Sequence, residues 1–285
     1  MYDVIIIGTG PAGLSAALTL KQLNKDILWL GSKNLSAKAS SAECIRNYPG
    51  LINVSGKEMQ EIFLKQIDTM GIEITEKQVT GVYDMSTHLG VLCGEEMFEA
   101  RSVLLTVGVE SVKPLPGELE NVGSGVSYCA TCDGFLYKGK EITVLATNKE
   151  FEDEIEYLAS LAEKVNVVVL YKDVELNKEN INIITDRPIE VKKVEKKMHM
   201  VFKDKEIVSD GIFMLKAAIS PSVLVPGIET AEGHIVIDRS GKTNLNGVFA
   251  AGDCTGKPYQ YTKAVGEGNV AAHSIVTYLA ELKRK

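Results

Sequence analysis

Cys129 and Cys132, two cysteines separated by two residues, are the side chains of this sequence best suited to redox chemistry. This spacing can close a small disulfide ring and is common in redox dithiols. The next residue, Asp133, can give or take a proton beside a thiolate. Half of a zinc site can have the same spacing, but zinc needs a second pair of ligands. The remaining cysteines and the histidines are scattered without ligand spacing, so we favour a redox dithiol over zinc.

Length and composition limit the classes of protein to consider. The chain has 285 residues, of which 45% are hydrophobic and 24% charged, which is typical of about two soluble domains. A net charge of −7 argues against a nucleic-acid partner. No apolar run approaches the roughly 20 residues of a membrane span, and no basic region precedes the first apolar run as in a signal peptide. An odd number of cysteines without an export signal predicts a reducing, cytoplasmic setting.

A glycine-rich turn follows the first apolar segment. Residues 4–7 read as a buried parallel strand, Gly8–Gly13 as a G-x-G-x-x-G turn, and residues 27–30 as the next strand after a helix. The three glycines permit a tight turn, let backbone N–H groups approach a pyrophosphate, and let the helix pack closely on the strand. The acidic residue expected after the second strand is replaced by Gly31-Ser32, so the adenosine must be held differently.

Two further segments, a turn at residues 47–50 and a strand at residues 247–253, matter for the family resemblance. Asn47-Tyr48-Pro49-Gly50 forms a turn in which Asn47 either contacts a cofactor or serves its own turn. The segment 247–253 is a strand that ends in Gly-Asp. With the turn at residues 8–13 and the block Cys-Ala-Thr-Cys-Asp-Gly, these segments occur in the order found in low-molecular-weight thioredoxin reductases. The sequence resembles that family over nearly its whole length.

The resemblance implies an α/β fold with two Rossmann-like, three-layer domains. An FAD domain made of residues 1–112 and 242–285 is interrupted by a central domain at 113–241, which carries the dithiol on a degenerate NADPH-type fold. The family also implies thioredoxin as partner and a homodimer. The FAD contacts that it implies are Gly8, Gly10, Pro11, Ala12, Gly13, Ser32, Lys38, Asn47, Val79, Thr106, Gly108, Gly252, Asp253, Gln260 and Tyr261.

The resemblance also implies roles for the redox residues. Cys132 lies beside the flavin, Cys129 exchanges with the partner disulfide, and Asp133 is the acid/base. One dithiol must contact first a buried flavin and then a protein partner. We therefore expect hinges at the two domain crossings, near Lys113–Gly117 and near Ile237–Thr243.

The central domain departs from the family where the family binds NADPH. A strand at 141–146, a helix at 151–162 and a strand at 165–171 form a second βαβ unit. Its turn, Ala146–Phe151, contains no glycine, so side chains occupy the space through which a pyrophosphate reaches backbone N–H groups.

Charge at the same turn also disfavours NADPH. Five acidic residues crowd the start of the helix: Glu150, Glu152, Asp153, Glu154 and Glu156. At about 4–8 Å and an effective dielectric near 20, each repels a phosphate charge by about 2–4 kcal/mol before salt screening. The His-Arg-Arg with which the family grips the 2′-phosphate is replaced by Tyr171-Lys172-Asp173. The sequence therefore predicts that NADPH does not bind in the usual way.

Other departures leave alternatives open. Where the family has Arg-Gln-Ala near the flavin, this chain has Tyr259-Gln260-Tyr261, and the two tyrosines either shield the flavin ring or pack as ordinary aromatics. Cys254 is expected to be a buried, inert thiol. The lysine-rich segment 192–197 and the basic C-terminus read as solvated faces, with docking of an acidic partner as the alternative.

A retained flavin and dithiol without an NADPH site indicate another electron donor. The sequence most resembles the ferredoxin-dependent flavin thioredoxin reductases. Electrons from a plant-type ferredoxin near −400 mV to thioredoxin near −270 mV run downhill by about 130 mV, or about 6 kcal/mol per pair. The alternatives are another donor such as flavodoxin or a deazaflavin, an oxygen-dependent dithiol oxidase, and a non-catalytic redox sensor.

Overall fold

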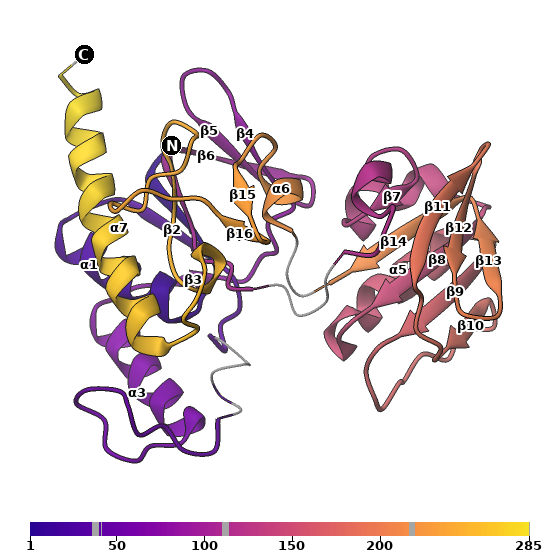
Figure 1. Cartoon of the computed structure of the whole chain (residues 1–285), viewed down its shortest axis with the longest axis horizontal. Helices are drawn as coiled ribbons and strands as arrows, with labels where there is room; N and C mark the ends of the chain where they lie inside the picture. Colours follow the sequence, from indigo (N-terminus) through magenta and orange to yellow (C-terminus); the bar gives the residue numbers. More distant parts are fainter. Residues whose placement is uncertain (36–39, 41, 110–113, 217–219, 285) are drawn as a thin grey trace. The chain divides into compact units, whose positions relative to one another are not determined.

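The computed structural model describes residues 1–35, 40, 42–109, 114–216 and 220–284 (Figure 1). The chain divides into two compact units. Unit 1 comprises Met1–Val109 and Leu224–Lys285, and unit 2 comprises Glu110–Val223. Each unit has its own sheet and its own hydrophobic core. The α/β fold class expected from the sequence is confirmed.

The second crossing between the units differs from the expected place. The sequence located it near Ile237–Thr243, but this segment lies inside unit 1. The reason is local hydrogen bonding: Lys242 N donates to Asp238 Oδ1 (3.0 Å), and Ala250 N donates to Gly241 O (2.9 Å). The segment is thereby held on the last strand of the unit 1 sheet, and the crossing falls before Leu224. Lys113, at the start of the other expected hinge, lies outside the described residues.

The sheet of unit 1 is mostly parallel. Its order is β3-β2-β1-β6-β5-β4, with β17 beside β6, and β1 pairs in parallel with both β2 and β6. The apolar run at the N-terminus forms the buried centre of this sheet, as its composition predicts. The strands are β1 Tyr2–Ile7, β2 Ile27–Leu30, β3 Ile74–Thr75, β4 Gly81–Asp84, β5 Leu89–Cys93, β6 Glu96–Leu105 and β17 Val248–Ala250.

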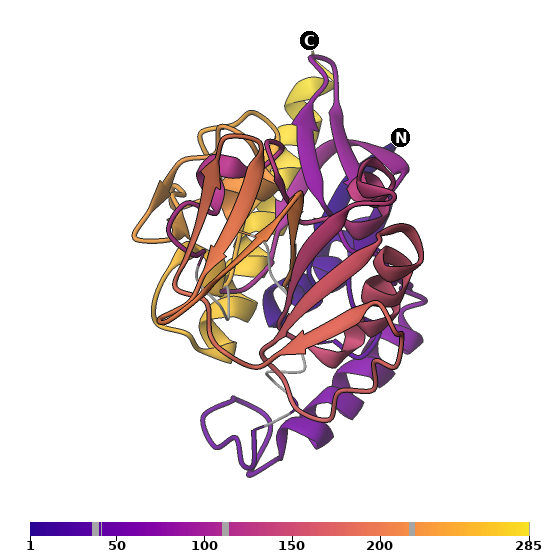
Figure 2. The same ribbon diagram turned by 90° about the vertical axis from the view of Figure 1, so that its right-hand side faces the viewer.

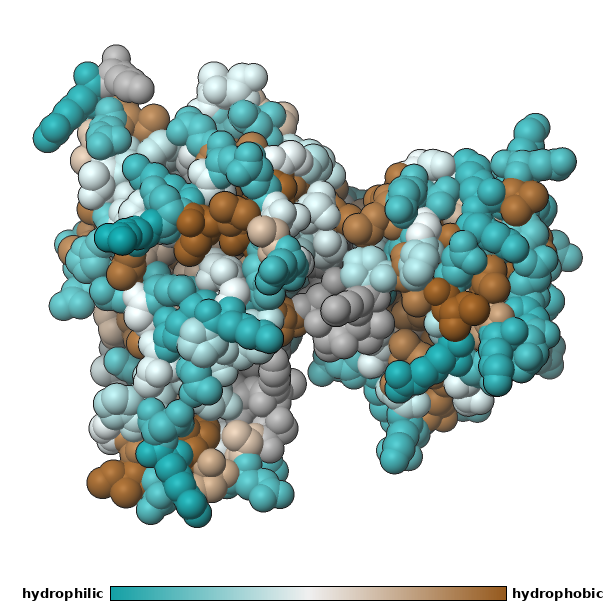
Figure 3. Space-filling model, in the orientation of Figure 1, coloured by the Kyte–Doolittle hydropathy of each residue, from teal (hydrophilic) through white to brown (hydrophobic). Residues whose placement is uncertain are grey.

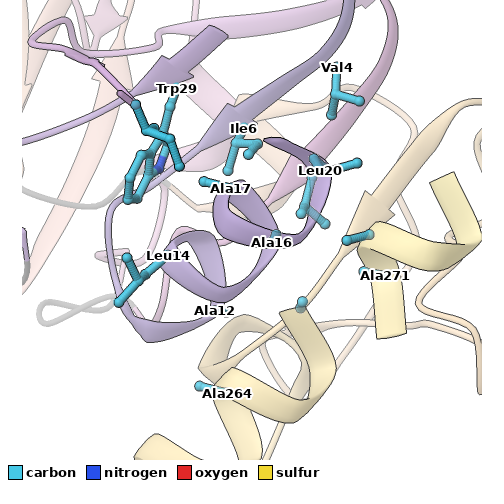
Figure 4. Packing of buried hydrophobic residues seen from close by; sticks show 14 of the residues in the cluster. Val4, Ile6, Ala12, Leu14, Ala16, Ala17, Leu20, Trp29, Ala264 and Ala271 are labelled. Carbon is cyan, nitrogen blue, oxygen red and sulfur yellow. The ribbon is translucent and has the colours of Figure 1, made fainter. Parts of the chain in front are cut away.

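Helix α1 (Pro11–Gln22) and the C-terminal helix α7 (Tyr261–Leu282) pack side by side in the core of unit 1 (Figure 4). Small residues line the contact, including Ala16 and Ala271. A Cβ at Gly268 of α7 would lie 2.1 Å from Ala12 O, so the close approach of the two helices requires glycine there. Unit 1 also contains α3 (Gly56–Thr69), η4 (Asp253–Thr255), β15 (Thr230–Ala231) and β16 (His234–Ile235).

Unit 2 has three layers. Figure 2 shows α5 (Glu152–Leu161) on one face of a parallel sheet and a three-stranded antiparallel sheet on the other. The parallel sheet has the order β10-β9-β8-β14-β7. Its strands are β7 Val126–Ser127, β8 Glu141–Ala146, β9 Lys164–Val169, β10 Ile181–Ile184 and β14 Gly211–Leu215. The antiparallel strands are β11 Glu190–Val194, β12 Lys197–Val201 and β13 Glu206–Ser209, and the short helices are η1 Leu119–Asn121, α4 Ala130–Asp133, η2 Gly134–Tyr137 and η3 Lys149–Phe151. The short helix α6 (Pro221–Leu224) spans the boundary between the two units.

The strands expected at 27–30 and 141–146 are confirmed, and the helix expected at 151–162 begins with a separate 3₁₀ turn. The lysine-rich segment 192–197 forms the β11–β12 hairpin, whose surroundings are largely hydrophilic (Figure 3). Lys192 pairs there with Glu206 (3.1 Å) and Lys197 with Asp210 (2.6 Å). No helix within the described ranges is long and apolar enough to cross a membrane.

Candidate flavin site and redox disulfide

Three strands of unit 1 end at one edge of the sheet. Ile7 of β1 and Ala250 of β17 both pair with Leu105 of β6. The residues that follow the three strands therefore lie along the same edge, and they include Gly8, Thr106 and the Gly252-Asp253 pair. The carboxyl edge of a parallel sheet is where such folds bind ligands.

The glycine turn is held by its neighbours and leaves backbone exposed. Gly8 has φ +106°, and its carbonyl accepts hydrogen bonds from Trp29 Nε1 and Thr106 Oγ1, each 2.9 Å. A Cβ at Gly13 would lie 2.2 Å from Gly8 O, so this position requires glycine. A Cβ at Gly10 would meet nothing within 4 Å. The backbone at Gly10, the N-cap of α1, is therefore open to a ligand.

A small hollow lies beside this turn. Its lining combines turn residues with apolar side chains of α1 and α3. The lining residues are Thr9, Gly10, Pro11, Leu14, Leu35, Gly56, Met59, Gln60 and Phe63.

The end of the chain completes this site. Asn47 Nδ2 donates to Gln260 Oε1 (2.9 Å), although the two residues are 213 positions apart. Gln260 is the N-cap of α7, and Tyr261 begins that helix. Burial, together with the Asp253 carboxylate, raises the pKa of Tyr261. The structure thus brings Asn47, Asp253, Gln260 and Tyr261 together, and Asn47 does more than serve its own turn.

Sequence reasoning missed two residues that hold the Gly252–Gly256 loop. Lys263 Nζ donates to the carbonyls of Gly252 (2.7 Å) and Gly256 (2.9 Å). Glu267 Oε2 accepts the N–H of Gly252 (2.8 Å) and pairs with Lys263 (3.0 Å). Their spacing of four residues on one helix face was the available signal. The pair holds the loop that carries Asp253 in one conformation.

The other expected cofactor residues have different surroundings. Ser32 follows β2 and accepts a hydrogen bond from Asn34 N (3.1 Å). Val79 is buried, so only its backbone is a candidate contact. Gly108 has φ +69° and open space where a Cβ would stand. Lys38 lies outside the described residues.

In unit 2, Cys129 and Cys132 form a disulfide with a Cα–Cα distance of 5.3 Å. Cys129 is the N-cap of α4, and the N–H of Cys132 donates to Cys129 Sγ (3.1 Å). A hydrogen bond donated to this sulfur stabilises negative charge on it once the disulfide opens. The two cysteines are only partly buried, so a partner can reach them.

The carboxyl group of Asp133 is held beside the disulfide by Ser127, a residue that sequence reasoning missed. Ser127 Oγ donates to Asp133 Oδ2 (2.6 Å) and accepts the N–H of Cys129 (3.1 Å). Ser127 ends β7, so the parallel sheet fixes its position. The only signal in the sequence was a small polar residue two positions before the first cysteine.

The comparisons with known proteins agree with this geometry. The family model described as pyridine nucleotide-disulphide oxidoreductase matches residues 2–268. Thioredoxin reductase from Bacillus subtilis (strain 168) is 31% identical, over 99% of this chain and 96% of the relative. The chain belongs to this family and, within it, to the thioredoxin reductases. Membership implies a flavin cofactor.

Two solved structures are similar over almost the whole chain. A ferredoxin-flavin thioredoxin reductase from Clostridium acetobutylicum is 44% identical with a TM-score of 0.92, and covers 100% of this chain and 99% of its own. A thioredoxin reductase from Gloeobacter violaceus is 27% identical with a TM-score of 0.80, and covers 98% of this chain and 94% of its own. The flavoprotein disulfide oxidoreductase expected from the sequence is confirmed.

The turn of unit 2 that corresponds to the glycine turn is filled by side chains in this thioredoxin reductase. Asn148 Oδ1 accepts the N–H of Glu150 (3.3 Å), so a backbone donor of the turn is already used. Glu152 Oε1 accepts the hydroxyl of Tyr171 (2.9 Å). Burial, and then the hydrogen bond to Glu152, raise the pKa of Tyr171. Burial also raises the pKa of Glu154.

A buried ionic cluster lies at the carboxyl edge of the unit 2 sheet. Lys216, directly after β14, donates to Glu118 Oε1 (2.6 Å), and the two residues are 2% and 0% exposed. Tyr128, adjacent to Cys129, donates to the same oxygen, and Leu115 N donates to Glu118 Oε2 (2.8 Å). The cluster joins the segment that leads to the disulfide to the segments where the chain enters and leaves unit 2.

The remaining thiols of the reductase differ from the redox pair. Cys254 is 1% exposed, and burial raises its pKa to about 12. Burial also raises the pKa of Cys93 to about 11. Cys44 is exposed. These surroundings support Cys254 as an inert buried thiol.

Proposed function

We propose that this protein reduces the disulfide of thioredoxin with electrons from reduced ferredoxin, through FAD held by unit 1 and the Cys129–Cys132 dithiol of unit 2. The observation that carries the proposal is the difference between its two nucleotide-type turns. The turn of unit 1 exposes backbone at Gly10, whereas the corresponding turn of unit 2 is filled by Asn148 and acidic side chains.

The residues of unit 1 fit FAD. The open backbone at the start of α1 suits the pyrophosphate, and the loop at Gly252-Asp253 suits the ribityl chain and phosphate. Asn47, Gln260 and Tyr261 supply polar and aromatic contacts for the ring system. FAD, when bound, takes electrons one or two at a time and delivers them in pairs to a disulfide.

The dithiol passes these electrons to thioredoxin by thiol–disulfide exchange. Cys129 releases its proton to water and attacks one sulfur of the thioredoxin disulfide; a mixed disulfide forms, and the other thioredoxin sulfur leaves and takes up a proton from water. Asp133 accepts the proton of Cys132, which then attacks the Cys129 sulfur. The second thioredoxin sulfur leaves and takes the proton from Asp133, which becomes ionised again, and the Cys129–Cys132 bond re-forms. Two electrons and two protons reach thioredoxin.

The surface after the dithiol suits a protein partner. Phe135 and Leu136, directly after the Cys-Ala-Thr-Cys-Asp-Gly segment, are 68% and 64% exposed. Adjacent exposed apolar side chains beside the disulfide can supply apolar contact area to a protein partner. We place the thioredoxin contact there.

Ferredoxin as donor rests on two supports. NADPH lacks a docking place, because the acidic start of α5 and the capped turn oppose a phosphate. The Clostridium acetobutylicum structure that is 44% identical to this chain is a ferredoxin-flavin thioredoxin reductase. A low-potential iron–sulfur donor makes the overall transfer favourable by about 6 kcal/mol per electron pair.

The test is an anaerobic titration of the flavin, followed by turnover with thioredoxin. Reduced ferredoxin should bleach the flavin and sustain thioredoxin reduction, whereas NADPH and NADH should do neither. Efficient turnover with NADPH alone would contradict the proposal, and so would failure with every low-potential one-electron donor. Flavodoxin and oxygen are run in parallel, so that a different donor or an oxidase activity is detected directly.

We further propose a homodimer in a cytoplasmic setting. Three unpaired cysteines, one of them exposed, are compatible with a reducing compartment. Sedimentation of the flavin-loaded protein at micromolar concentration should give twice the monomer mass, and a monomer at every concentration would contradict the dimer.

A further inference from the structure

Ser127 makes an unusual set of contacts for a single buried hydroxyl. Its Oγ lies 2.6 Å from Asp133 Oδ2, 3.1 Å from Cys129 N and 3.2 Å from Cys129 O. Ser127 is 5% exposed, and its strand, β7, pairs with Phe213 of β14. The hydroxyl thus has a fixed position between the carboxyl group of Asp133 and the backbone of Cys129.

This arrangement satisfies both protonation states of Asp133. A hydroxyl has one proton to donate and two lone pairs that accept. With Asp133 ionised, Ser127 donates to the carboxylate and accepts the Cys129 N–H. With Asp133 protonated, the carboxylic acid donates to Ser127 Oγ, and the hydroxyl proton turns to Cys129 O. The Asp133 carboxyl group and the Ser127 hydroxyl therefore keep a hydrogen-bond partner in both states. Protonation of Asp133 then avoids the free-energy cost of leaving a polar group without a hydrogen bond.

We propose that Ser127 is a positioning residue for the dithiol reaction, which keeps the Asp133 carboxyl group in place while that group gains and loses a proton. The inference rests on the proposed role of Asp133. In the exchange with thioredoxin, Asp133 takes the proton of Cys132, which forms its bond to Cys129 while the bond from Cys129 to thioredoxin breaks. Asp133 then gives this proton to the leaving thioredoxin sulfur. Ser127 itself neither gains nor loses a proton overall.

The hydroxyl also links the carboxyl group to the attacking cysteine. Because Ser127 accepts the N–H of Cys129, the main chain at Cys129 and the carboxyl group of Asp133 are held by one atom. Asp133 N donates to Cys129 O (3.3 Å) and closes the same small ring. Removal of the hydroxyl leaves that backbone contact, so α4 keeps its start while the carboxyl group is released.

A double-mutant cycle tests the inference. The flavin-loaded protein is reduced with dithionite and freed of excess reductant under anaerobic conditions. It is then mixed with oxidised thioredoxin, and new thiols are counted by alkylation and mass spectrometry. Ser127→Ala should lower the maximal exchange rate about tenfold, as expected for a lost hydrogen bond to a charged group, with the half-saturating thioredoxin concentration unchanged.

The decisive comparison uses Asp133→Asn. If Ser127 acts through this carboxyl group, Ser127→Ala should slow the Asp133→Asn protein less than twofold. Ser209→Ala, which removes another buried serine hydroxyl of unit 2, should leave the rate as in the unmodified protein. The inference would be overturned if Ser127→Ala slowed the exchange equally in the unmodified protein and in the Asp133→Asn protein. It would also be overturned if Ser127→Ala did not slow the unmodified protein.

A small aromatic disulfide, 5,5′-dithiobis(2-nitrobenzoate), separates this inference from the proposed function. Electron transfer to this probe but not to thioredoxin would refute the proposed partner. The double-mutant cycle could then still be measured with the probe as acceptor. A normal rate for Asp133→Asn with both acceptors would overturn the role of Asp133 and this inference together.

Discussion

The two βαβ units of this protein share a topology but differ at the turn where the strand meets the helix. In unit 1, β1 leads through glycines to α1 and then to β2, which pairs in parallel with β1. In unit 2, β8 leads through a turn without glycine to α5 and then to β9, again parallel. A ligand can approach the first turn at Gly10, whereas Asn148 already caps the second.

Under the proposed function, this difference means that topology alone does not make a dinucleotide site. The strands and helix of unit 2 persist because their buried apolar side chains stabilise them, with Ile155 and Leu158 of α5 fully buried. Binding depends instead on a few turn positions where side chains are absent. A βαβ unit can therefore keep its fold while its turn lacks the glycines that let a pyrophosphate approach.

The units also divide the chemistry. Unit 1 holds the candidate flavin site and buried thiols, and unit 2 holds the redox disulfide and an edge filled by paired polar groups. Four predictions test this comparison, beginning with the largest expected effect.

Cys132→Ser should abolish thioredoxin reduction, because the disulfide that receives the electron pair cannot form. The flavin should still be reduced by dithionite, since unit 1 is unchanged. Cys129→Ser should instead leave the Cys132 thiolate free and give a long-wavelength thiolate–flavin absorption band. Absorbance spectra and turnover measure both. Spectra swapped between the variants would reverse the roles assigned to the two sulfurs.

Lys216→Met should destabilise the protein by about 3–5 kcal/mol, because it leaves the fully buried Glu118 carboxylate without its charge partner. Denaturant unfolding measures the change. Lys197→Met is the control, since its exposed pair with Asp210 is worth at most about 1 kcal/mol. Equal effects for the two variants would show that the cluster at the edge of unit 2 is not a structural anchor.

Gly13→Ala and Gly10→Ala should separate folding from binding in the turn of unit 1. At Gly13 the new methyl group meets Gly8 O at 2.2 Å, so we expect a loss of about 1–3 kcal/mol and a lower melting temperature. At Gly10 it meets nothing within 4 Å, so stability should change by less than about 0.5 kcal/mol. FAD affinity should fall in both variants. Unchanged FAD content in Gly10→Ala would contradict the placement of the pyrophosphate.

The smallest effect concerns thiol labelling at different pH. Iodoacetamide reacts with thiolates, and burial raises the pKa of Cys254 to about 12 and that of Cys93 to about 11. A raised pKa keeps a thiol neutral at pH 8, so only the exposed Cys44 should be labelled in the oxidised native protein. Labelling in denaturant at the same pH should reach all three. Rapid native labelling of Cys254 would contradict its assignment as an inert buried thiol.

Several elements follow from local sequence. The continuous apolar run at residues 4–7, followed at once by a glycine, predicts a buried strand, and the glycines after it specify the turn. The Cys-x-x-Cys spacing brings two sulfurs within bonding distance on one turn of chain. The acidic residues in the first turn of α5 could also be predicted, because they are consecutive in the sequence. Such features depend on residues within a few positions of one another.

Features made by distant residues were not predictable. Nothing in the sequence marks Glu118 as the partner of Lys216, or the second crossing before Leu224. The three-stranded sheet β11–β13 was not predicted, although the buried Met198 and Met200 alternate with more exposed residues along β12. Its strands are only four or five residues long, and which strands pair is not visible in the sequence.

The sequence by itself determined the groups available to this protein: a glycine turn, a redox dithiol and a second turn that lacks glycine and is followed by acidic residues. Only the tertiary structure decided how these groups are held. Asn47 contacts Gln260 across 213 residues, and Glu118 meets Lys216 across 98. Local spacing fixes which atoms are near along the chain, whereas contacts at such separations exist only once the sheets have formed and excluded water around them.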